Sequence, residues 1–385
     1  MKAAVAAELA AAYDSAAVDE MRADGFVQRR GRLTLHLARE FGFCYGVERA
    51  VDYAYQTRKR FPDKRVCLTG EIIHNPHVND RLRAQGIEIL TDANADASTL
   101  GPNDVVILPA FGVSIAELVA LEARGCTLVD TTCGSVLNVW KNVRRYAQDG
   151  FTSVIHGKVK HEETRATASQ AIQFPDGHFL IVLDEGEAQI ACDYIRGTGH
   201  REAFLTRFAA AVSPGFDPDL HLARIGCANQ TTMLMSESLA IGEMFRAAMR
   251  DRYGDAEAAT RFRAFDTICS ATQERQDAVL AMLDQEPLQL MVVIGGYNSS
   301  NTCNLARICA DKVPTFHIAD PGCLVSTTEI CHRPIGQPST APANDQVTRN
   351  WLPAGDVVVG LTAGASTPNN LVGQAIRRLQ ELAGQ

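Results

Sequence analysis

The feature that most constrains the fold is a pattern that occurs three times, in which a strand-like apolar run is followed by a cysteine and then by a segment with helical periodicity. The three junction cysteines are Cys44, Cys133 and Cys269, and the runs before them begin at Leu33, Thr127 and Phe262. Strands that alternate with helices in this way form βαβ units, in which helices cover a parallel sheet. The sequence therefore predicts an α/β fold with mainly parallel sheets.

Each junction cysteine is followed by a second strand and then by a polar loop that opens another helix. These loops begin at His74, His161 and Ser299, which lie 30, 28 and 30 residues after the preceding junction cysteine. A third strand follows in each copy, and the middle copy of this strand, near Arg224, is the least regular. Such even spacing predicts three tandem repeats. Because ligands gather at the carboxyl ends of parallel strands, the three sets of loops are expected to serve one central site.

The repeats define the expected domains. We expect a helical N-terminal extension over residues 1–32 and three pseudo-threefold-related α/β domains over 33–132, 133–266 and 267–385, with the first strand able to pack against the third domain. Insertions near 171–222 and 319–353 are rich in Pro, Gly and charged residues, and we expect them to be surface loops. The acidic, Ala-rich start predicts an amphipathic helix rather than an export signal.

Composition limits the partners and the compartment. The chain has 37 Lys and Arg against 45 Asp and Glu, and this net charge of −8 argues against a nucleic-acid partner. We find no apolar run of the roughly 20 residues that a membrane span needs. Eleven cysteines, without a CxxC pair or a secretion signal, favour reduced thiols in a cytoplasmic protein and a role in metal binding or catalysis.

The junction cysteines are candidate metal ligands. A helix N-terminus stabilises a thiolate, which is the form of cysteine that binds iron. For any one of them a small buried hydrophobe is the simpler interpretation, but matched positions in three repeats favour ligation. Three thiolates could hold zinc, although zinc with three sulfurs and no fixed fourth partner is unusual. A [4Fe–4S] cluster with three cysteine ligands and one open iron provides a Lewis-acid site instead.

The polar loops predict an anion site. Ser299, Ser300 and Asn301 open one expected helix and Ser366 opens another, where backbone N–H groups and the helix dipole favour phosphate. Simple N-capping explains Ser366 equally well when it is taken alone. His74 and His161 in the matching loops favour a phosphate pocket.

Glu163 is the candidate proton donor. We identify its loop as the one repeat loop that carries carboxylates, and Glu162 competes with it for the role. A solvated helix N-terminus would also explain either carboxylate. Neighbouring residues at a helix start point about 100° apart, so only one of the two can face a cavity together with His161.

Seven motifs, in order, resemble the 4-hydroxy-3-methylbut-2-enyl diphosphate reductase family over nearly the whole chain after residue 32. They occupy residues 42–50, 71–75, 130–133, 161–164, 229–232, 298–301 and 362–366. The insertions and residues 267–276 are similar to the longer form found in plants and cyanobacteria. The resemblance implies three α/β domains around a [4Fe–4S] cluster. It also implies a two-electron reduction of the allylic alcohol diphosphate to isopentenyl and dimethylallyl diphosphate, with electrons from a ferredoxin or flavodoxin.

By motif matching, the resemblance also implies roles for single residues. Cys44, Cys133 and Cys269 would hold the cluster; His74, His161, Ser299, Ser300, Asn301 and Ser366 would hold the diphosphate; Glu163 would supply protons, assisted by Thr231. The match has departures: Phe111 stands where many bacterial members have His, and Gly134 and Asn138 stand where the family usually has Pro and Lys. Alternative functions are a paralogue that reduces another allylic or diphosphate substrate, a non-catalytic iron–sulfur sensor, and a zinc hydrolase.

Overall fold

The structure is a computed structural model that describes residues 2–93, 95–265, 267–337 and 345–384. Contacts within the chain divide it into two compact units. The first unit combines both ends of the chain, residues 1–97 and 270–385, and the second unit is the continuous segment 98–269.

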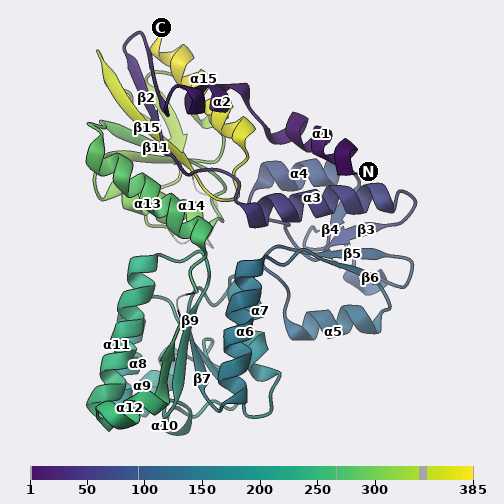
Figure 1. Cartoon of the computed structure of the whole chain (residues 1–385), viewed down its shortest axis with the longest axis vertical. Coiled ribbons are helices and arrows are strands. Elements are labelled where there is room, and N and C mark those ends of the chain that lie inside the picture. Colours follow the sequence, from purple (N-terminus) through teal and green to yellow (C-terminus); the bar gives the residue numbers. More distant parts are fainter. Residues whose placement is uncertain (1, 94, 266, 338–344, 385) are drawn as a thin grey trace. The chain divides into compact units, whose positions relative to one another are not determined.

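The main sheet of the first unit has the strand order β1-β2-β15-β11-β12 (Figure 1). Its strands are β1 (Val27–Arg30), β2 (Leu33–Leu37), β11 (Leu290–Ile294), β12 (Thr315–Ile318) and β15 (Val357–Ala363). All neighbouring strands are parallel except β1 and β2, which form an antiparallel pair. Strand β2, from the start of the chain, is thereby paired with β15, from its end.

Helices cover both faces of this sheet, and the alternation of side chains along β11 shows why. Leu290, Val292 and Ile294 belong to a core shared with helix α15 (Asn369–Ala383), whereas Met291 and Val293 belong to a core shared with α13 (Ser270–Gln285) and α14 (Ser300–Ala310). Successive strand residues point to opposite faces, so a strand buried on both faces is apolar throughout. This is the continuous apolar run that the sequence shows.

The other elements of the first unit come from both of the chain segments that form it. They are the helices α1 (Lys2–Tyr13), α2 (Ala16–Ala23), α3 (Tyr45–Arg60) and α4 (Pro76–Ala84), the parallel pair β3 (Val66–Leu68) and β4 (Ile87–Ile89), the short helix η2 (Pro321–Cys323), and the antiparallel pair β13 (Glu329–His332) and β14 (Gln346–Arg349).

The sheet of the second unit has the order β10-β9-β7-β8, and all its strands are parallel. These strands are β7 (Thr152–His156), β8 (Phe179–Val182), β9 (Ile225–Asn229) and β10 (Phe262–Ala264). One core contains side chains of α6 (Gly134–Gln148), and another contains side chains of α8 (Glu185–Arg196) and α11 (Met235–Tyr253).

The remaining elements of the second unit are the parallel pair β5 (Val105–Leu108) and β6 (Thr127–Asp130), and the helices α5 (Ile115–Ala123), α7 (Glu162–Ile172), α9 (Arg201–Arg207), α10 (Pro218–His221) and α12 (Asp255–Arg261). The helix η1 (Ala97–Thr99) lies where the two units meet in the sequence.

The predicted α/β fold with mainly parallel sheets is confirmed, and each predicted junction strand and helix is present. The prediction of a surface loop over residues 171–222 is wrong. This segment contains the buried strand β8 and the helix α8, whose Cys192 is in the core. Its Pro and Gly residues lie mainly in the connections and its charged residues mainly in the helices α8, α9 and α10, and together they concealed a short apolar strand of only four residues.

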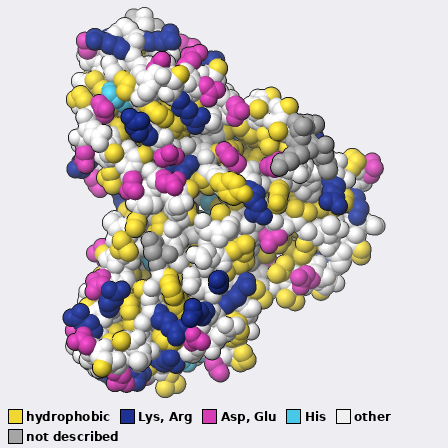
Figure 2. Space-filling view, in the orientation of Figure 1, with side chains coloured by type: hydrophobic (Ala, Val, Ile, Leu, Met, Phe, Trp, Pro, Cys, Tyr) yellow, Lys and Arg dark blue, Asp and Glu magenta, His cyan; other side chains and the backbone are white. Residues whose placement is uncertain are grey.

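The surface carries charges of both signs. Acidic and basic side chains are interspersed over the face shown in Figure 2, in keeping with a modest net charge of −8. Within the part of the chain that the structure describes, no helix is both long and apolar enough to cross a membrane.

The N-terminal extension is part of the core of the first unit. Val18 and Met21 of α2 are fully buried and pack in the same cluster as β2, β11 and α15. The predicted amphipathic helix is instead two helices, and the second one places these apolar residues on one face.

We predict that Met21→Ala destabilises the first unit by about 2 to 5 kcal/mol, because truncating a buried methionine leaves a cavity. The measurement is thermal or urea unfolding followed by circular dichroism. Glu20→Ala, at a neighbouring exposed position of the same helix, is the matched control and should change stability by less than about 0.5 kcal/mol. Equal stability of the two variants would contradict the assignment of α2 to the core.

Candidate functional site

Cys44 lies at the N-cap of α3, at the end of a loop that is tied to strand β15. The backbone N–H of Gly42 donates to the carbonyl oxygen of Ala363 at 3.2 Å, and that of Cys44 donates to Ala365 at 3.2 Å. Gly42 has a positive φ of 71°, and a Cβ there would lie 3.1 Å from the carbonyl oxygen of Thr367. The loop therefore follows one path, which presents the cysteine thiol at the start of a helix.

Three of the predicted anion-binding residues lie together at the start of α14. Ser299 is the N-cap, and its hydroxyl accepts a hydrogen bond from the N–H of Thr302 at 3.3 Å. Ser300 and Asn301 follow in the first turn, and all three are buried. The Asn301 Oδ1 atom accepts from the N–H of Ala365 at 2.9 Å, and its Nδ2 atom has no hydrogen-bond partner among the described residues. This helix start therefore offers hydrogen-bond donors from side chains and backbone, and the side chains are buried.

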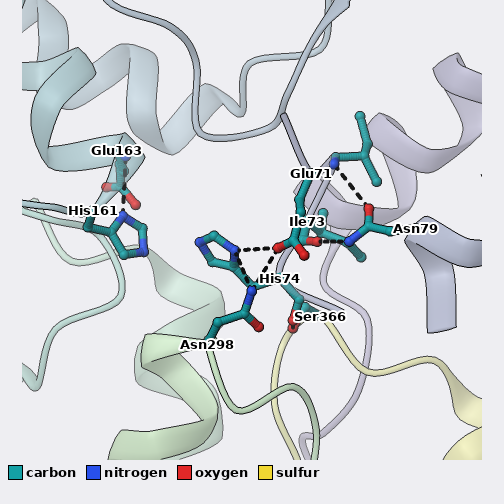
Figure 3. A network of polar contacts seen from close by, with 9 residues as sticks. Glu71, Ile73, His74, Asn79, His161, Glu163, Asn298 and Ser366 are labelled. Atoms are coloured by element: carbon teal, nitrogen blue, oxygen red, sulfur yellow. Dashed lines mark hydrogen bonds and ion pairs between the residues drawn. The ribbon is translucent and has the colours of Figure 1, made fainter. Parts of the chain in front are cut away.

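His74 and Ser366 join this group in the first unit. The Ser366 hydroxyl donates to the carbonyl oxygen of His74 at 3.1 Å. The His74 Nδ1 atom lies 3.0 Å from the Glu71 carboxylate, and the Asn298 side-chain amide donates to the same carboxylate oxygen at 2.7 Å (Figure 3). The contact between the carboxylate and Nδ1 fixes the orientation of the ring. His74 is thus held by two other loops of the same unit.

This network corrects one expectation. We expected carboxylates in only the loop of Glu163, but Glu71 brings a second one into contact with a predicted site residue. Glu71 and Asn298 both lie inside motifs that the sequence singled out, at 71–75 and 298–301, and neither was given a role. Their side chains are brought together by the fold, across 227 residues, and this contact has no sequence signal.

Glycine allows these loops to approach one another closely. A Cβ on Gly296 would lie 2.5 Å from the carbonyl oxygen of His74, and one on Gly364 would lie 1.9 Å from the hydroxyl oxygen of Thr302. Real Cβ atoms do not tolerate such distances, so only glycine permits these contacts. The loops after β11 and β15 are packed too tightly for any larger residue at these two positions.

In the second unit, Cys133 and Cys269 both immediately precede helices. Cys133 is the N-cap of α6, and its N–H donates to Ala110 at 3.0 Å. Cys269 directly precedes Ser270, the first residue of α13, and its N–H donates to the carbonyl oxygen of Thr231 at 3.3 Å. Backbone bonds therefore fix both thiol-bearing residues, and one of them is bonded to the predicted hydroxyl relay.

Glu163 and Thr231 form a direct pair in the second unit. The Thr231 N–H donates to one oxygen of the Glu163 carboxylate at 2.6 Å, and its hydroxyl group lies 3.1 Å from the other. Glu163 is 1% exposed, whereas the neighbouring Glu162 is on the surface. The two carboxylates therefore differ sharply in environment, and only that of Glu163 is buried.

His161 precedes this pair as the N-cap of α7, with extended backbone angles. Its Nδ1 atom accepts a hydrogen bond from the N–H of Glu163 at 3.2 Å (Figure 3). The helix begins at Glu162, so the chain still has loop geometry at His161. The Phe111 ring meets the imidazole edge to face, with 5.9 Å between ring centroids. An aromatic contact thus supports the ring of His161.

The loop that carries Thr231 is linked to the segment that carries Cys269. The Asn229 N–H donates to the Thr267 hydroxyl oxygen at 3.0 Å, and that hydroxyl donates to Asn229 Oδ1 at 2.6 Å. Gln230 accepts bonds from the Lys158 N–H and the Thr164 hydroxyl at 3.2 and 3.1 Å. Thr231 therefore directly follows two anchored residues.

The junction cysteines differ from the core cysteines in environment. Cys44, Cys133 and Cys269 are half-buried, whereas Cys192, Cys227 and Cys309 are buried. Burial raises the pKa of the Cys192 thiol to about 12 and raises the pKa values of Cys227 and Cys309 as well, so these three thiols stay protonated. None of the eleven cysteines, all of which are in the described part of the chain, forms a disulfide. Burial therefore disfavours the three core thiols as metal ligands, whereas the junction cysteines are more accessible and lie at helix starts.

Comparisons with known proteins agree with one another. The family model described as LytB protein matches residues 35–380. The 4-hydroxy-3-methylbut-2-enyl diphosphate reductase of Synechococcus sp. strain RCC307 is 50% identical over 98% of this chain and 91% of its own length. The protein of the same name from Gloeobacter violaceus is 49% identical over 100% of this chain and 91% of its own length.

Two solved structures share the fold. One is an (E)-4-hydroxy-3-methyl-but-2-enyl diphosphate reductase, 24% identical, with a TM-score of 0.52 and coverage of 90% of this chain and 99% of the other. The second is the E-1-hydroxy-2-methyl-but-2-enyl-4-diphosphate reductase of Plasmodium falciparum, 20% identical, with a TM-score of 0.63 and coverage of 90% and 87%.

His317 lies beneath the loop that leads to Ser299 and gives a pH prediction. It is buried, its Nε2 atom lies 3.0 Å from the carbonyl oxygen of Gly295, and burial lowers its pKa to about 4. An unfolded histidine has a pKa near 6.5, so the unfolded state binds the extra proton and folding stability falls as the pH falls from about 6.5 towards 4.

We predict that His317→Gln reduces this acid-dependent loss by about 2 to 3 kcal/mol at pH 4.5 relative to pH 7. Urea unfolding of the variant and the unchanged protein at both pH values is the measurement. His200→Gln removes an exposed histidine and should leave the loss unchanged. The same loss in the unchanged protein and in His317→Gln would show that His317 is not held neutral.

Proposed function

This chain belongs to the LytB family, that of the 4-hydroxy-3-methylbut-2-enyl diphosphate reductases, and we propose that it catalyses the reductive dehydroxylation of 4-hydroxy-3-methylbut-2-enyl diphosphate. The reaction consumes two electrons and two protons, breaks the allylic C–O bond, releases the hydroxyl group as water and yields isopentenyl and dimethylallyl diphosphate. The observation that carries the proposal is the buried carboxylate of Glu163, held by Thr231 in a chain about half identical to reductases of that name.

An iron–sulfur cofactor fits the cysteines of this chain. The family is iron–sulfur dependent, and we assign Cys44, Cys133 and Cys269 as the three ligands of a [4Fe–4S] cluster with one open iron. Each is half-buried and lies directly before or at a helix start, where the dipole favours thiolate. When bound, such a cluster supplies the electrons and a Lewis-acid iron.

The diphosphate would be held by neutral donors, by histidines and by helix starts. Ser299, Ser300 and Asn301 supply hydroxyl, amide and backbone N–H groups at the start of α14, and Ser366 adds a hydroxyl from the next loop. His74 adds an imidazole oriented by Glu71, and His161 adds a second imidazole. Each neutral donor of this kind is worth about 1 kcal/mol, and charged partners are worth more.

Glu163 would hold and deliver the protons. A general acid must reach the reacting group and be protected from exchange with bulk water, and Glu163 is buried whereas Glu162 is exposed. The Thr231 hydroxyl lies 3.1 Å from the carboxylate, close enough to relay a proton. A sensor protein would need neither this pair nor the anion loops, so the pair favours an enzyme.

The electron donor would be a small redox protein, and a ferredoxin or a flavodoxin meets the requirement for low-potential electrons.

The direct test of the function is an anaerobic assay in which a chemically reduced dye replaces the protein electron donor. Consumption of the hydroxylated C5 diphosphate and formation of both products would support the proposal. A protein that holds its cluster but leaves this substrate unchanged would contradict it.

We predict that Cys44→Ser, Cys133→Ser and Cys269→Ser each abolish the cluster, because a cluster with only two thiolate ligands left is not retained. Iron and sulfide content of anaerobically purified proteins is the measurement. Cys126→Ser is the control, because Cys126 is also half-buried but lies in the loop before β6 and should leave the iron content normal. Normal iron in Cys133→Ser would overturn the ligand assignment.

We predict that Glu163→Gln lowers turnover by about 10² or more, because glutamine keeps the size and hydrogen bonding of the side chain but cannot transfer a proton. Iron content and substrate affinity should stay near normal. Glu162→Gln, one residue away at an exposed position, is the control and should have a mild effect. If Glu163→Gln turned over at the normal rate, another group would have to be the acid.

A further inference from the structure

The side chain of Arg275 is buried and hydrogen-bonded, and it has no role in the proposed reaction. It lies on α13, is 3% exposed, and donates three hydrogen bonds to the loop before Cys44. Its Nε and Nη2 atoms lie 3.1 and 2.8 Å from the carbonyl oxygen of Gly42, and Nη2 also lies 3.1 Å from that of Phe43. The planar guanidinium thus binds two successive carbonyl groups immediately before the cysteine.

The same side chain also contacts its own helix close to the second cysteine-bearing segment. The Arg275 Nη1 atom donates to the carbonyl oxygen of Ala271 at 2.8 Å. Ala271 lies two residues after Cys269 in the sequence. One guanidinium therefore joins the loop that ends in Cys44 to the first turn of the helix that follows Cys269.

The charge of Arg275 requires an explanation. Burying a cation is costly unless a negative group or several hydrogen bonds offset it. Among the described residues, no carboxylate lies within ion-pair distance of Arg275; Glu48 is close enough for the Arg275 charge to lower its pKa, although burial has the larger, opposite effect. Carbonyl oxygens alone carry only partial charge. Cys44 directly follows the two carbonyl groups that Arg275 binds, so a thiolate ligand there would add negative charge to the segment that the guanidinium contacts.

The loop that Arg275 binds is also tied to strand β15, and its Phe43 ring lies 5.5 Å from the ring of Tyr13 in α1. Gly42 and Cys44 are bonded to the end of β15 through Ala363 and Ala365. Arg275 binds the Gly42 and Phe43 carbonyl groups from α13. Removing the guanidinium would leave these carbonyl groups without the donors that fix the direction of the chain into Cys44.

We propose that Arg275 is a positioning residue for Cys44, which fixes the backbone of the ligand loop and couples it to the helix after Cys269. This inference rests on the proposed iron–sulfur function. Arg275 acts through the carbonyl oxygens of Gly42 and Phe43 and takes no part in the chemistry. Groups that orient metal ligands in this way typically contribute about 10- to 100-fold to metal affinity.

The test compares Arg275→Met and Arg275→Lys with matched changes at Arg378. Arg378 is a suitable control because it also binds two successive carbonyl groups, those of Leu324 and Val325 at 3.0 and 2.6 Å, far along the sequence from any junction cysteine. The holoenzymes are challenged anaerobically with an iron chelator, and the absorbance of the cluster is followed. The apoproteins are treated with a limiting alkylating reagent, and the labelling rate of each cysteine is measured by mass spectrometry.

We expect Arg275→Met to shorten the lifetime of the cluster by about tenfold or more, with Arg275→Lys in between because an ammonium keeps the charge but loses the planar fork. The labelling rate of Cys44 should change several-fold in Arg275→Met apoprotein, while that of Cys126 stays constant. Arg378→Met should leave the cluster lifetime and the Cys44 labelling rate normal, even if it lowers the melting temperature as much as Arg275→Met does.

Normal cluster lifetime and normal Cys44 labelling in both Arg275 variants would overturn the inference. So would equal losses in Arg275→Met and Arg378→Met. If Arg275→Met does not fold, Arg275→Lys decides: a shorter lifetime at an unchanged melting temperature supports the inference, and a normal lifetime refutes it. A wild-type protein that holds no cluster would count against the proposed function instead, and the labelling rate of Cys44 would still test Arg275.

Discussion

The parallel pairing of β2, β15 and β11 is the constraint on which the site in the first unit depends. Parallel strands end at the same edge of a sheet, so the loops after β2, β15 and β11 emerge side by side. These loops carry Cys44, Ser366 and Ser299, and Cys44 is separated from the two serines by more than 200 residues in the sequence. The bonds from Cys44 to Ala365 and from Ala365 to Asn301 then join the three loops into one structure. The two ends of the chain must meet in one sheet before any of this can form.

The second unit solves a different physical problem, which is to keep a carboxylate buried. Glu163 accepts a hydrogen bond from the backbone of Thr231, and the Thr231 hydroxyl group lies beside its other oxygen, so the carboxylate is not left unsatisfied in its buried place. The backbone N–H of Glu163 donates a hydrogen bond to His161 Nδ1, which fixes the start of α7. Thr231 is fixed in turn by the bonds of its neighbours Asn229 and Gln230. A proton on Glu163 would therefore move along a defined hydrogen bond rather than into water.

Much of this arrangement could be predicted from the sequence, because it depends on local signals. Strands, helices and the cysteines between them follow from hydrophobic periodicity, and the capping roles of Ser299 and His161 follow from their places before helical segments. Most contacts between distant segments could not be predicted in the same way. The bond of Asn298 to Glu71 and the bonds of Arg275 to Gly42 join residues more than 200 positions apart. For β2, the sequence predicted that the first strand can pack against the third domain, but not that its partner is β15. Strand β8 was missed for a different reason, since four apolar residues among charged neighbours give too short a pattern.

The choice of groups at the loops proposed to bind the diphosphate also has a physical reason. The chain has a net charge of −8, and a buried Lys or Arg without a partner would cost several kcal/mol in the absence of substrate. Serine and asparagine side chains and helix N–H groups can face an anion without that cost, because the loops already satisfy part of their hydrogen bonding. His74 adds an imidazole nitrogen, and the contact with the Glu71 carboxylate orients its ring. Binding by neutral donors and helix dipoles would suit an enzyme that must hold a diphosphate during reduction and then release a product that carries the same diphosphate.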